Sequence, residues 1–526
     1  MAVGVTFIVL SAPVLAALVA AGATRTESSR WADVRGRPSD FRPCSPLSDV
    51  RTIPAMRRGW SEAMSSTDAS FLRIESDHEP QHVGSLSILE GEPLRDETGR
   101  IESDRLLHHV ERRLHRVPRL RQKVKEVPLG QGRPVWVDDD SFDLEYHVRI
   151  TALARPGDDR QLATLMSRLQ SLPLDRRRPL WEMWFVDGLE SGDVGLVIKT
   201  HHALGDGIAN VDLALALVDL ESSPSPDPDP PHWTPRPAPT ASELWVDGVS
   251  EQLTSPVRLG QAAVGAARNP RAAIGATTDV VRTALSFRSR PPRAPWNQEV
   301  SPHRRWEHAD IPFEVVHCIR SRTEATVNDI VLAACTGAIR EYLTRQGHGV
   351  HGRVVKAMVP VSKRTEEEHG ETLGNRISLI IVELPVDEED PIVRLQRLQA
   401  ATSELKADAG LMAGAQRIVE FADLVPTLAG VLTRFVSRSI PMNLVITNIP
   451  GPPVPLYLQG ARVLRTYPYV EVIDDEGLTM AVVSYDGHLF FGVTSDRDVM
   501  PELDQLASGI DREFCVLLEA TGAQKG

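Results

Sequence analysis

The chain has 526 residues, of which 42% are hydrophobic and 25% are charged, so it is long enough for two globular domains with sizeable cores. Its formal net charge of -13 argues against a general nucleic-acid-binding protein, because such proteins carry a basic surface. Its four cysteines are widely spaced and form no CxxC pair, which argues against a disulfide framework and against a cysteine metal site. A reducing, cytoplasmic environment is therefore expected.

The N-terminal leader is apolar and then polar. Residues 1–22 carry no charge and are about as long as a membrane span, whereas residues 24–55 are polar and predicted to be unstructured. Three interpretations stay open: a membrane anchor, a secretory signal without the usual basic start, or a leader that is not translated because synthesis begins at Met56 or Met64. We therefore treat residues 1–60 as separate from the folded domains.

Alternating strand and helix patterns fill residues 61–221, which we assign to the first of two halves. This half opens with the stretch MSSTDASFL at residues 64–72. The predicted strands are 81–89, 135–137, 146–148, 184–187 and 194–200, and the predicted helices are 103–124, which is basic, 161–172 and 208–220.

A connecting region, 222–310, separates the halves. It begins with the proline-rich linker SSPSPDPDPPHWTPRPAPT and continues as a weakly basic helical stretch to about Phe287, which is either a connecting helix or a membrane-surface helix. Strands and helices return in the second half, 311–522. There the predicted helices start at 325–333 and cover 407–439, and the predicted strands are 354–361, 374–384, 443–448, 478–484 and 489–494.

Two adjacent histidines follow the strand 194–200, within the stretch KTHHALGDG. Histidines at a strand end that face a tight loop occupy a common location for catalytic groups. The glycines on either side of Asp206 permit a sharp bend, and Asp206 can hold an imidazole or fix the loop through a charged contact. A metal site is disfavoured, because adjacent strand residues point to opposite faces and no His or Cys cluster at ligand spacing accompanies the pair. The arrangement suits a general base.

His-His-x-x-x-Asp-Gly after a strand is similar to the signature of the acyltransferase superfamily that includes chloramphenicol acetyltransferase and peptide-synthetase condensation domains. Together with an ordered series of further motifs, it makes the chain resemble the bacterial wax ester synthase/acyl-CoA:diacylglycerol acyltransferase family over about residues 64–520. The motifs are MSSTDASFL, PLDRRRPLWE, HHALGDG, TVNDIVLA, MVPVS with GNRIS, and NIPGPPVPLY. The resemblance implies an α/β (α+β) fold of two chloramphenicol-acetyltransferase-like halves, with the active site at their interface and a tunnel that admits both substrates.

The resemblance also implies roles for the motif residues. His202 would be the general base, which removes the proton of the acceptor hydroxyl as that oxygen attacks the thioester of acyl-CoA. His201 would support this base, Asp206 would orient it, and Gly207 would contribute only backbone.

Other motif residues keep two interpretations. Asn328 and Asp329 match the Asn-Asp motif of the family, where they either hold the oxyanion or the acceptor, or cap a helix. Asn375, with its neighbour Arg376, either lines the substrate site or forms a turn. The Pro-Leu-Trp motif at 179–181 is expected to be structural, and one departure from the family is Arg177, where Ser is usual.

The expected reaction is direct transfer, because the sequence has no GxSxG elbow, Walker loop or dinucleotide fingerprint. Acyl-CoA would be a substrate, with no cofactor and no metal. The acceptor would be diacylglycerol, giving triacylglycerol, or a long-chain alcohol, giving a wax ester. The alternatives are an acyltransferase for another lipid or polyketide hydroxyl and a catalytically idle lipid-binding paralogue. We expect a cytoplasmic protein attached peripherally to a membrane surface or to lipid inclusions.

Overall fold

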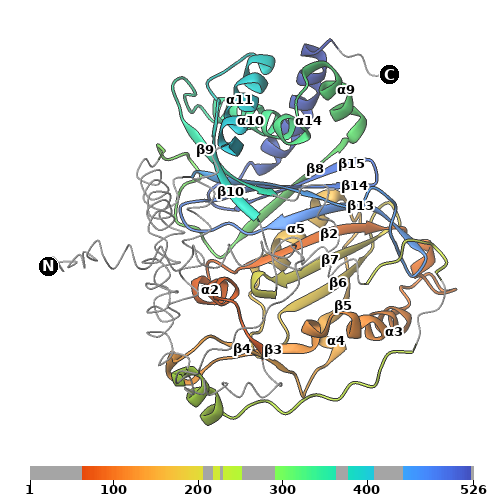
Figure 1. Ribbon diagram of the computed structural model, residues 1–526. Helices are drawn as coiled ribbons and strands as arrows, with labels where there is room; N and C mark the ends of the chain where they lie inside the picture. The colour runs from red at the N-terminus through yellow and green to blue at the C-terminus, as the bar shows by residue number, and fades with distance from the viewer. Residues whose placement is uncertain are drawn as a thin grey trace, which may run out of the picture.

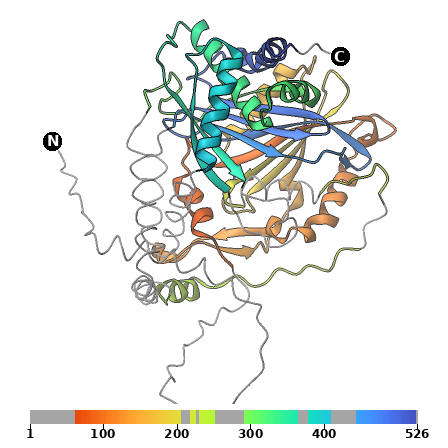
Figure 2. The same ribbon diagram turned by 45° about the horizontal axis from the view of Figure 1, so that its top comes forward.

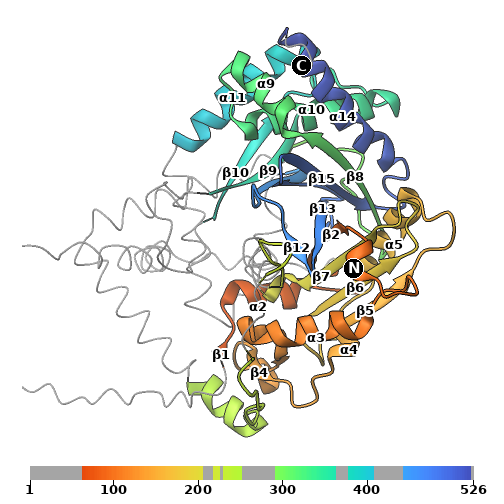
Figure 3. The same ribbon diagram turned by 90° about the vertical axis from the view of Figure 1, so that its right-hand side faces the viewer.

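The computed structural model describes residues 62–204, 217–224, 229–250, 291–362, 377–407 and 442–522. Two halves, each built on a six-stranded sheet, stack on one another (Figures 1 and 3). The predicted mixed helix and sheet architecture is therefore confirmed. The leader 1–60, the helical stretch to Phe287 and nearly all of the predicted helices 208–220 and 407–439 lie outside the described residues.

The first sheet carries the histidine strand near its centre, with the strand order β12-β13-β2-β7-β6-β5. Helices α2 (Ser66–Ile74), α3 (Ser103–Arg113), α4 (Leu144–His147) and α5 (Asp159–Ser171) belong to this half. A small sheet of β1 (Glu62–Ala63), β4 (Val135–Asp138) and β3 (Gln122–Lys125) lies at its edge. The large strands are β2 (His82–Leu89), β5 (Val148–Ala152), β6 (Trp181–Asp187), β7 (Val194–His201), β12 (Tyr457–Leu458) and β13 (Ala461–Val470).

Helices cover one face of the second sheet, as Figures 1 and 2 show. The strand order is β10-β9-β11-β14-β15-β8, and the largest buried apolar cluster packs between these strands and the helices. The helices are α9 (Phe313–Thr323), α10 (Val327–Arg345), α11 (Pro391–Ala407) and α14 (Leu503–Ala520). The strands are β8 (Arg304–Pro312), β9 (Val355–Ser362), β10 (Ile377–Leu384), β11 (Leu444–Pro450), β14 (Leu478–Tyr485) and β15 (His488–Asp496).

Strand β13 joins the two halves, because it comes late in the chain but pairs antiparallel with β2 of the first sheet. It also lies close to the second sheet. A Cβ at Gly492 of β15 would collide with the carbonyl oxygen of Pro468 in β13, so glycine permits this approach. Trp306 of β8 donates its indole N–H to the same carbonyl at 3.2 Å. The halves are therefore connected through a shared strand as well as through packed side chains.

Two predicted elements of the first half are wrong in extent. The helix predicted at 103–124 ends at Arg113, since Val117 precedes Pro118 and takes an extended φ of -132°, which a residue before proline favours. The strand predicted at 146–148 begins only at Val148. Asp143 accepts the N–H of Glu145 at 3.1 Å and so starts the short helix α4 instead.

The proline-rich linker contains no helix or strand over 229–240, as predicted, and residues 241–250 form a helix. In the part of the chain that the structure describes, no helix is both long enough and apolar enough to cross a membrane.

A tyrosine hydroxyl ties the sheets together. Tyr485 of β14 is 2% exposed, accepts the N–H of Leu456 at 2.9 Å and donates to the carbonyl of Val463 at 2.8 Å. Tyr485→Phe should lower the free energy of unfolding by about 2 kcal/mol, because it leaves two buried backbone groups unpaired. Urea denaturation measures this loss.

The control for this measurement is Tyr457→Phe, at a half-buried tyrosine on β12, which should unfold close to the wild-type urea concentration. Equal stability of Tyr485→Phe and the wild type would show that the hydroxyl link contributes nothing.

Candidate active site

The two motif histidines lie where β7 ends and a short 3-10 turn, His202–Leu204, begins. His201 is fully buried, and its backbone N–H donates to the carbonyl of Leu180 at 3.0 Å. His202 is half-buried, and its backbone N–H donates to the backbone carbonyl of Gln81 at 2.9 Å. The ring of Phe71 stacks on the His202 imidazole with centroids 3.9 Å apart and planes within 12°. Backbone and ring contacts thus hold the plane of the second imidazole.

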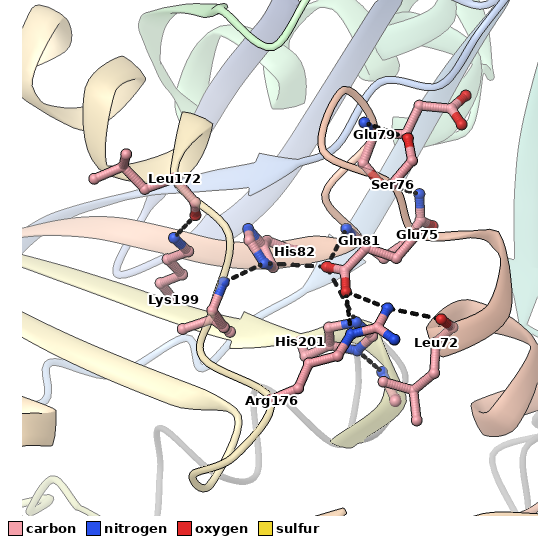
Figure 4. A network of polar contacts seen from close by, with 12 residues as sticks. Leu72, Glu75, Ser76, Glu79, Gln81, His82, Leu172, Arg176, Lys199 and His201 are labelled. Atoms are coloured by element: carbon pink, nitrogen blue, oxygen red, sulfur yellow. Dashed lines mark hydrogen bonds and ion pairs between the residues drawn. The ribbon is translucent and has the colours of Figure 1, made fainter. Parts of the chain in front are cut away.

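A buried carboxylate lies between two imidazoles (Figure 4). Glu75 Oε1 is 3.4 Å from His201 Nε2 and 3.5 Å from Nε2 of His82, the residue opposite His201 on β2. Arg176 binds Glu75 Oε2 through its Nε at 2.8 Å. Burial acts to raise the pKa of Glu75, but the hydrogen bond and charge of His201, joined by Arg176, outweigh burial and hold the pKa below 4.5. Glu75 is therefore ionised at neutral pH.

Helix α2 presents one functional face to the histidines. Asp68, Phe71 and Glu75 follow one another at i, i+3 and i+7, the spacing that places side chains on one side of a helix. Ser65 starts the helix by accepting the N–H of Asp68 at 3.0 Å. Burial raises the pKa of Asp68, while Ser65, Arg119 and His202 act against that rise. The MSSTDASFL motif therefore builds the wall of the site beside the base.

A buried lysine lies behind the histidines on the same strand. Lys199 is 1% exposed and donates to the carbonyls of Leu169, at 2.8 Å, and Leu172, at the C-terminal end of α5. The Leu169 carbonyl also accepts the backbone N–H of Leu172, the C-cap of α5, and the ammonium adds a charged donor at this helix end. Burial lowers the pKa of Lys199 to about 8. His82 beside it is fully buried, and its pKa is lowered well below 6.5 by burial and then by Lys199, so His82 is neutral at pH 7.

An apolar groove runs between the halves, and Thr200, two residues before His202, is one of its lining residues. Its floor is one face of the first sheet, where paired residues of β13, β2 and β7 alternate inward. Its roof comes from the NIPGPPVPLY motif, through Ile449, Gly451, Pro452 and Leu456. The floor residues are Val470, Pro468 and Thr466 of β13, Val83, Ser85, Ser87 and Leu89 of β2, and Thr200, Ile198 and Leu196 of β7.

The aspartate of the Asn-Asp motif makes structural contacts at the start of helix α10. Thr326 is the N-cap of α10, and Asp329 accepts its hydroxyl at 2.6 Å and that of Thr402 at 2.8 Å. Asp329 is 4% exposed, and none of these bonds joins it to the histidines. Asn328 is half-buried in the first turn of the same helix. Asp206, Gly207 and Asn375, with Arg376, lie outside the described residues.

Two neighbouring arginines of PLDRRRPLWE, Arg176 and Arg177, make different contacts. Arg176 reaches Glu75, whereas Arg177 is exposed and pairs with Asp175 in its own turn at 2.9 Å, so the departure from the family lies away from the base. Trp181 is buried and donates to Leu120 at 2.8 Å, which agrees with a structural role.

Sequence reasoning missed several groups around the histidines: Asp68, Phe71, Glu75, His82, Arg176 and Lys199. The i, i+3, i+7 spacing on α2 was a usable signal for three of them. The proximity of His82 and Arg176 depends on tertiary packing. Within the described ranges, no group of three or more His, Cys, Asp or Glu residues is arranged to hold a metal ion.

Comparison with known proteins places this site in a family. Residues 64–331 match the wax ester synthase/diacylglycerol acyltransferase catalytic domain, and residues 373–517 match the WS/DGAT C-terminal domain. The chain belongs to the wax ester synthase/diacylglycerol acyltransferase family. It is 33% identical over 482 residues to a probable diacylglycerol O-acyltransferase, tgs1, of Mycobacterium tuberculosis, covering 88% of this chain and 97% of that protein.

Solved structures agree with the family. A wax ester synthase/diacylglycerol acyltransferase from Marinobacter aquaeolei VT8 is similar with a TM-score of 0.62 and 25% identity, over 88% of this chain and all of that chain. A starter condensation domain of rhizomide synthetase RzmA has a TM-score of 0.52 at 12% identity, over 88% and 95% of the two chains, which shows a shared fold. The predicted fold class of two chloramphenicol-acetyltransferase-like halves is confirmed.

Lys199 should make stability depend on pH. Because its pKa falls from 10.5 to about 8 on folding, the unfolded chain binds more protons between these values, and stability rises with pH across that window. Between about pH 8 and pH 10.5, the free energy of unfolding of the wild type should rise by roughly 3 kcal/mol relative to that of Lys199→Met. Urea unfolding of both proteins at pH 7.5 and pH 10 measures the difference. Parallel pH dependences would contradict a depressed lysine pKa.

Proposed function

We propose that this protein transfers a long-chain acyl group from acyl-CoA to the hydroxyl of diacylglycerol, and also to long-chain alcohols. The single observation that carries the proposal is that the half-buried His202 directly follows β7, a strand that lines an apolar groove formed by both halves. An imidazole can accept a hydroxyl proton, and an apolar groove can hold an acyl chain. The names of the relatives support the same reaction and the same acceptors.

In this proposal, His202 removes the proton of the acceptor hydroxyl as the oxygen attacks the thioester carbonyl. The C–O bond forms, the C–S bond breaks, and the imidazolium gives its proton to the departing CoA thiolate. His201 and Glu75 act behind the base, since the carboxylate holds His201 while the Phe71 ring orients His202. Asp206 and Gly207 keep their expected orienting and backbone roles as part of the proposal, and so do Asn328 and Asn375 as candidate substrate contacts.

The groove suits the acyl chain in length and polarity. From Val83, next to His82, to Leu89 the floor spans six residue-to-residue steps along β2, or about 20 Å, which is comparable with an extended palmitoyl chain. Most lining side chains are apolar. Gly451 in the roof packs against the Ser484 backbone so closely that a Cβ would collide with it. The roof is thus pressed onto β14 and leaves the space below it open.

Two alternatives remain distinct from this proposal: an acyltransferase for another lipid or polyketide hydroxyl, and a catalytically idle lipid-binding paralogue. The intact His202, Glu75 and Arg176 contacts favour turnover over the idle form. The proposal includes direct transfer without a cofactor. It also includes peripheral attachment to a membrane surface or lipid inclusions, because both substrates carry long hydrocarbon chains.

The first test removes the base. Purified protein receives labelled palmitoyl-CoA with diacylglycerol or with a long-chain alcohol, and ester formation is measured. His202→Ala should lower the turnover number by roughly 10² to 10⁴, because general-base catalysis is lost. The product ratio ranks the acceptors.

Its control is His303→Ala, at an exposed histidine, which should retain wild-type rates, and circular dichroism checks the fold of both variants. A folded His202→Ala protein with full activity would refute the base assignment. A labelled acyl-enzyme formed from acyl-CoA alone would refute direct transfer.

A second test concerns the groove. Ser87 lies on its floor midway along β2, with its hydroxyl 3.0 Å from that of Thr466. Ser87→Phe should block the distal groove and lower kcat/KM for palmitoyl-CoA at least about tenfold, the loss expected when a few methylenes are excluded. Octanoyl-CoA, assayed with the same preparation, should react almost as before. Equal losses for both substrates would place the acyl chain elsewhere.

A further inference from the structure

A second buried glutamate, Glu471, follows a different strand from those of the histidines and comes from a different element than Glu75. Glu471 directly follows β13, whose last pair with β2 is Val470 opposite Val83. One further step along the antiparallel register leads to His82, which itself pairs with His201. Neighbouring strands lie about 4.8 Å apart. The register therefore brings a carboxyl from the late part of the chain into the row of histidines.

Glu471 is not bonded as a structural glutamate is. Glu471 is 9% exposed, and its Oε2 atom is buried without a hydrogen-bond partner among the described residues. The Nδ1 atom of His202 is buried and without a partner in the same sense. A buried polar atom without a partner costs folding free energy, and such atoms collect where function requires them. Two of them here are groups of opposite charge when ionised.

The charged neighbours of the pair are few. Glu471 interacts electrostatically with His202 first, then with His201 and with Arg304 of β8. From α2, Asp68 faces His202 but is held by Ser65 and Arg119, and Glu75 is bound to Arg176 and His201. His82 of β2 is neutral. Among the described carboxyls facing His202, Glu471 is thus the one with a buried oxygen that has no hydrogen-bond partner.

We propose that Glu471 is a positioning residue for His202, whose carboxylate stabilises the imidazolium that forms during acyl transfer. This inference rests on the proposed function. The proton moves from the acceptor hydroxyl to His202 and then to the CoA thiolate, while Glu471 neither gains nor loses it. Because Glu471 comes from the late part of the chain and His202 from the first half, the base is fully supported only when the two are packed together.

The electrostatics agree with this role. Burial raises the pKa of Glu471, and the attraction of His202 acts against that rise. The carboxyl therefore ionises most readily when the neighbouring imidazole is charged, which is the state that the reaction creates. It also costs stability in the resting protein, since a raised pKa means that stability falls as pH rises above 4.5.

The chain offers a matched control five residues further on. Glu476 is 5% exposed, its Oε2 also lacks a partner in the described structure, and burial raises its pKa. The charges that act on it are those of Asp475 and Glu79, and no histidine is among them. Glu471→Gln and Glu476→Gln therefore remove the same group from similar burial, but only the first change removes it from beside the base.

The test compares kcat, KM and the pH profile of kcat/KM for the three proteins, with palmitoyl-CoA and the better acceptor. Glu471→Gln should lower kcat about tenfold, as expected for a charge interaction of about one pKa unit, and leave KM for acyl-CoA unchanged. The acidic limb of its profile should move to lower pH, because the base loses a stabilising negative charge. Both variants should unfold at a higher temperature than the wild type at pH 8.

Wild-type kcat and an unmoved acidic limb in Glu471→Gln would overturn the inference, and so would an equal change in Glu476→Gln. A second readout needs no turnover: in NMR spectra, the His202 C2 proton should titrate at lower pH in Glu471→Gln than in the wild type, and not in Glu476→Gln. If the wild type esterifies no acceptor, the proposed function fails, while this titration still decides whether Glu471 acts on His202.

Discussion

The pairing of β13 with β2 is the constraint on which the rest of this structure depends. It inserts a strand from the last quarter of the chain into the sheet that carries the histidines. The same strand provides one edge of the groove floor, approaches β15 where Gly492 leaves room, and is directly followed by Glu471. Without this pairing, β2 would be an open edge, the groove would lack a wall, and the base would face only the residues of its own half.

Around the histidines, charged and neutral polar groups alternate with depth. The ionised Glu75 is neutralised by Arg176 and shared by two imidazoles, while the buried ammonium of Lys199 lies one layer deeper on the carbonyl end of α5. This order keeps His82 neutral, while His202, the residue after β7, is half-buried. The apolar groove and the charged layer lie on opposite faces of the same three strands, because successive strand residues point in opposite directions.

Much of the fold was predictable from the sequence, because alternation on strands such as β7, β14 and β15 is strong and the turn at Asp486–Gly487 is marked by glycine. The fold family followed from ordered motifs. Local rules failed where a short signal opposed a longer pattern, as at Pro118 and Asp143. The site was predicted only on its motif strand. Sequence patterns do not state which sheet the strand 461–470 joins, so Glu471 had no visible connection with His202. The run of three arginines gave no sign that Arg176 is the one that binds Glu75.

The apolar groove has a consequence for how long the protein persists in a cell. A groove walled by Val, Leu, Ile and Pro side chains gains contacts when an acyl chain fills it, and a ligand that binds only the folded state shifts the folding equilibrium in proportion to its concentration. The unfolded fraction exposed to proteases therefore falls when long-chain acyl-CoA is abundant and rises when it is scarce. In the proposed function, the supply of acyl-CoA would therefore affect the lifetime of the protein as well as its rate.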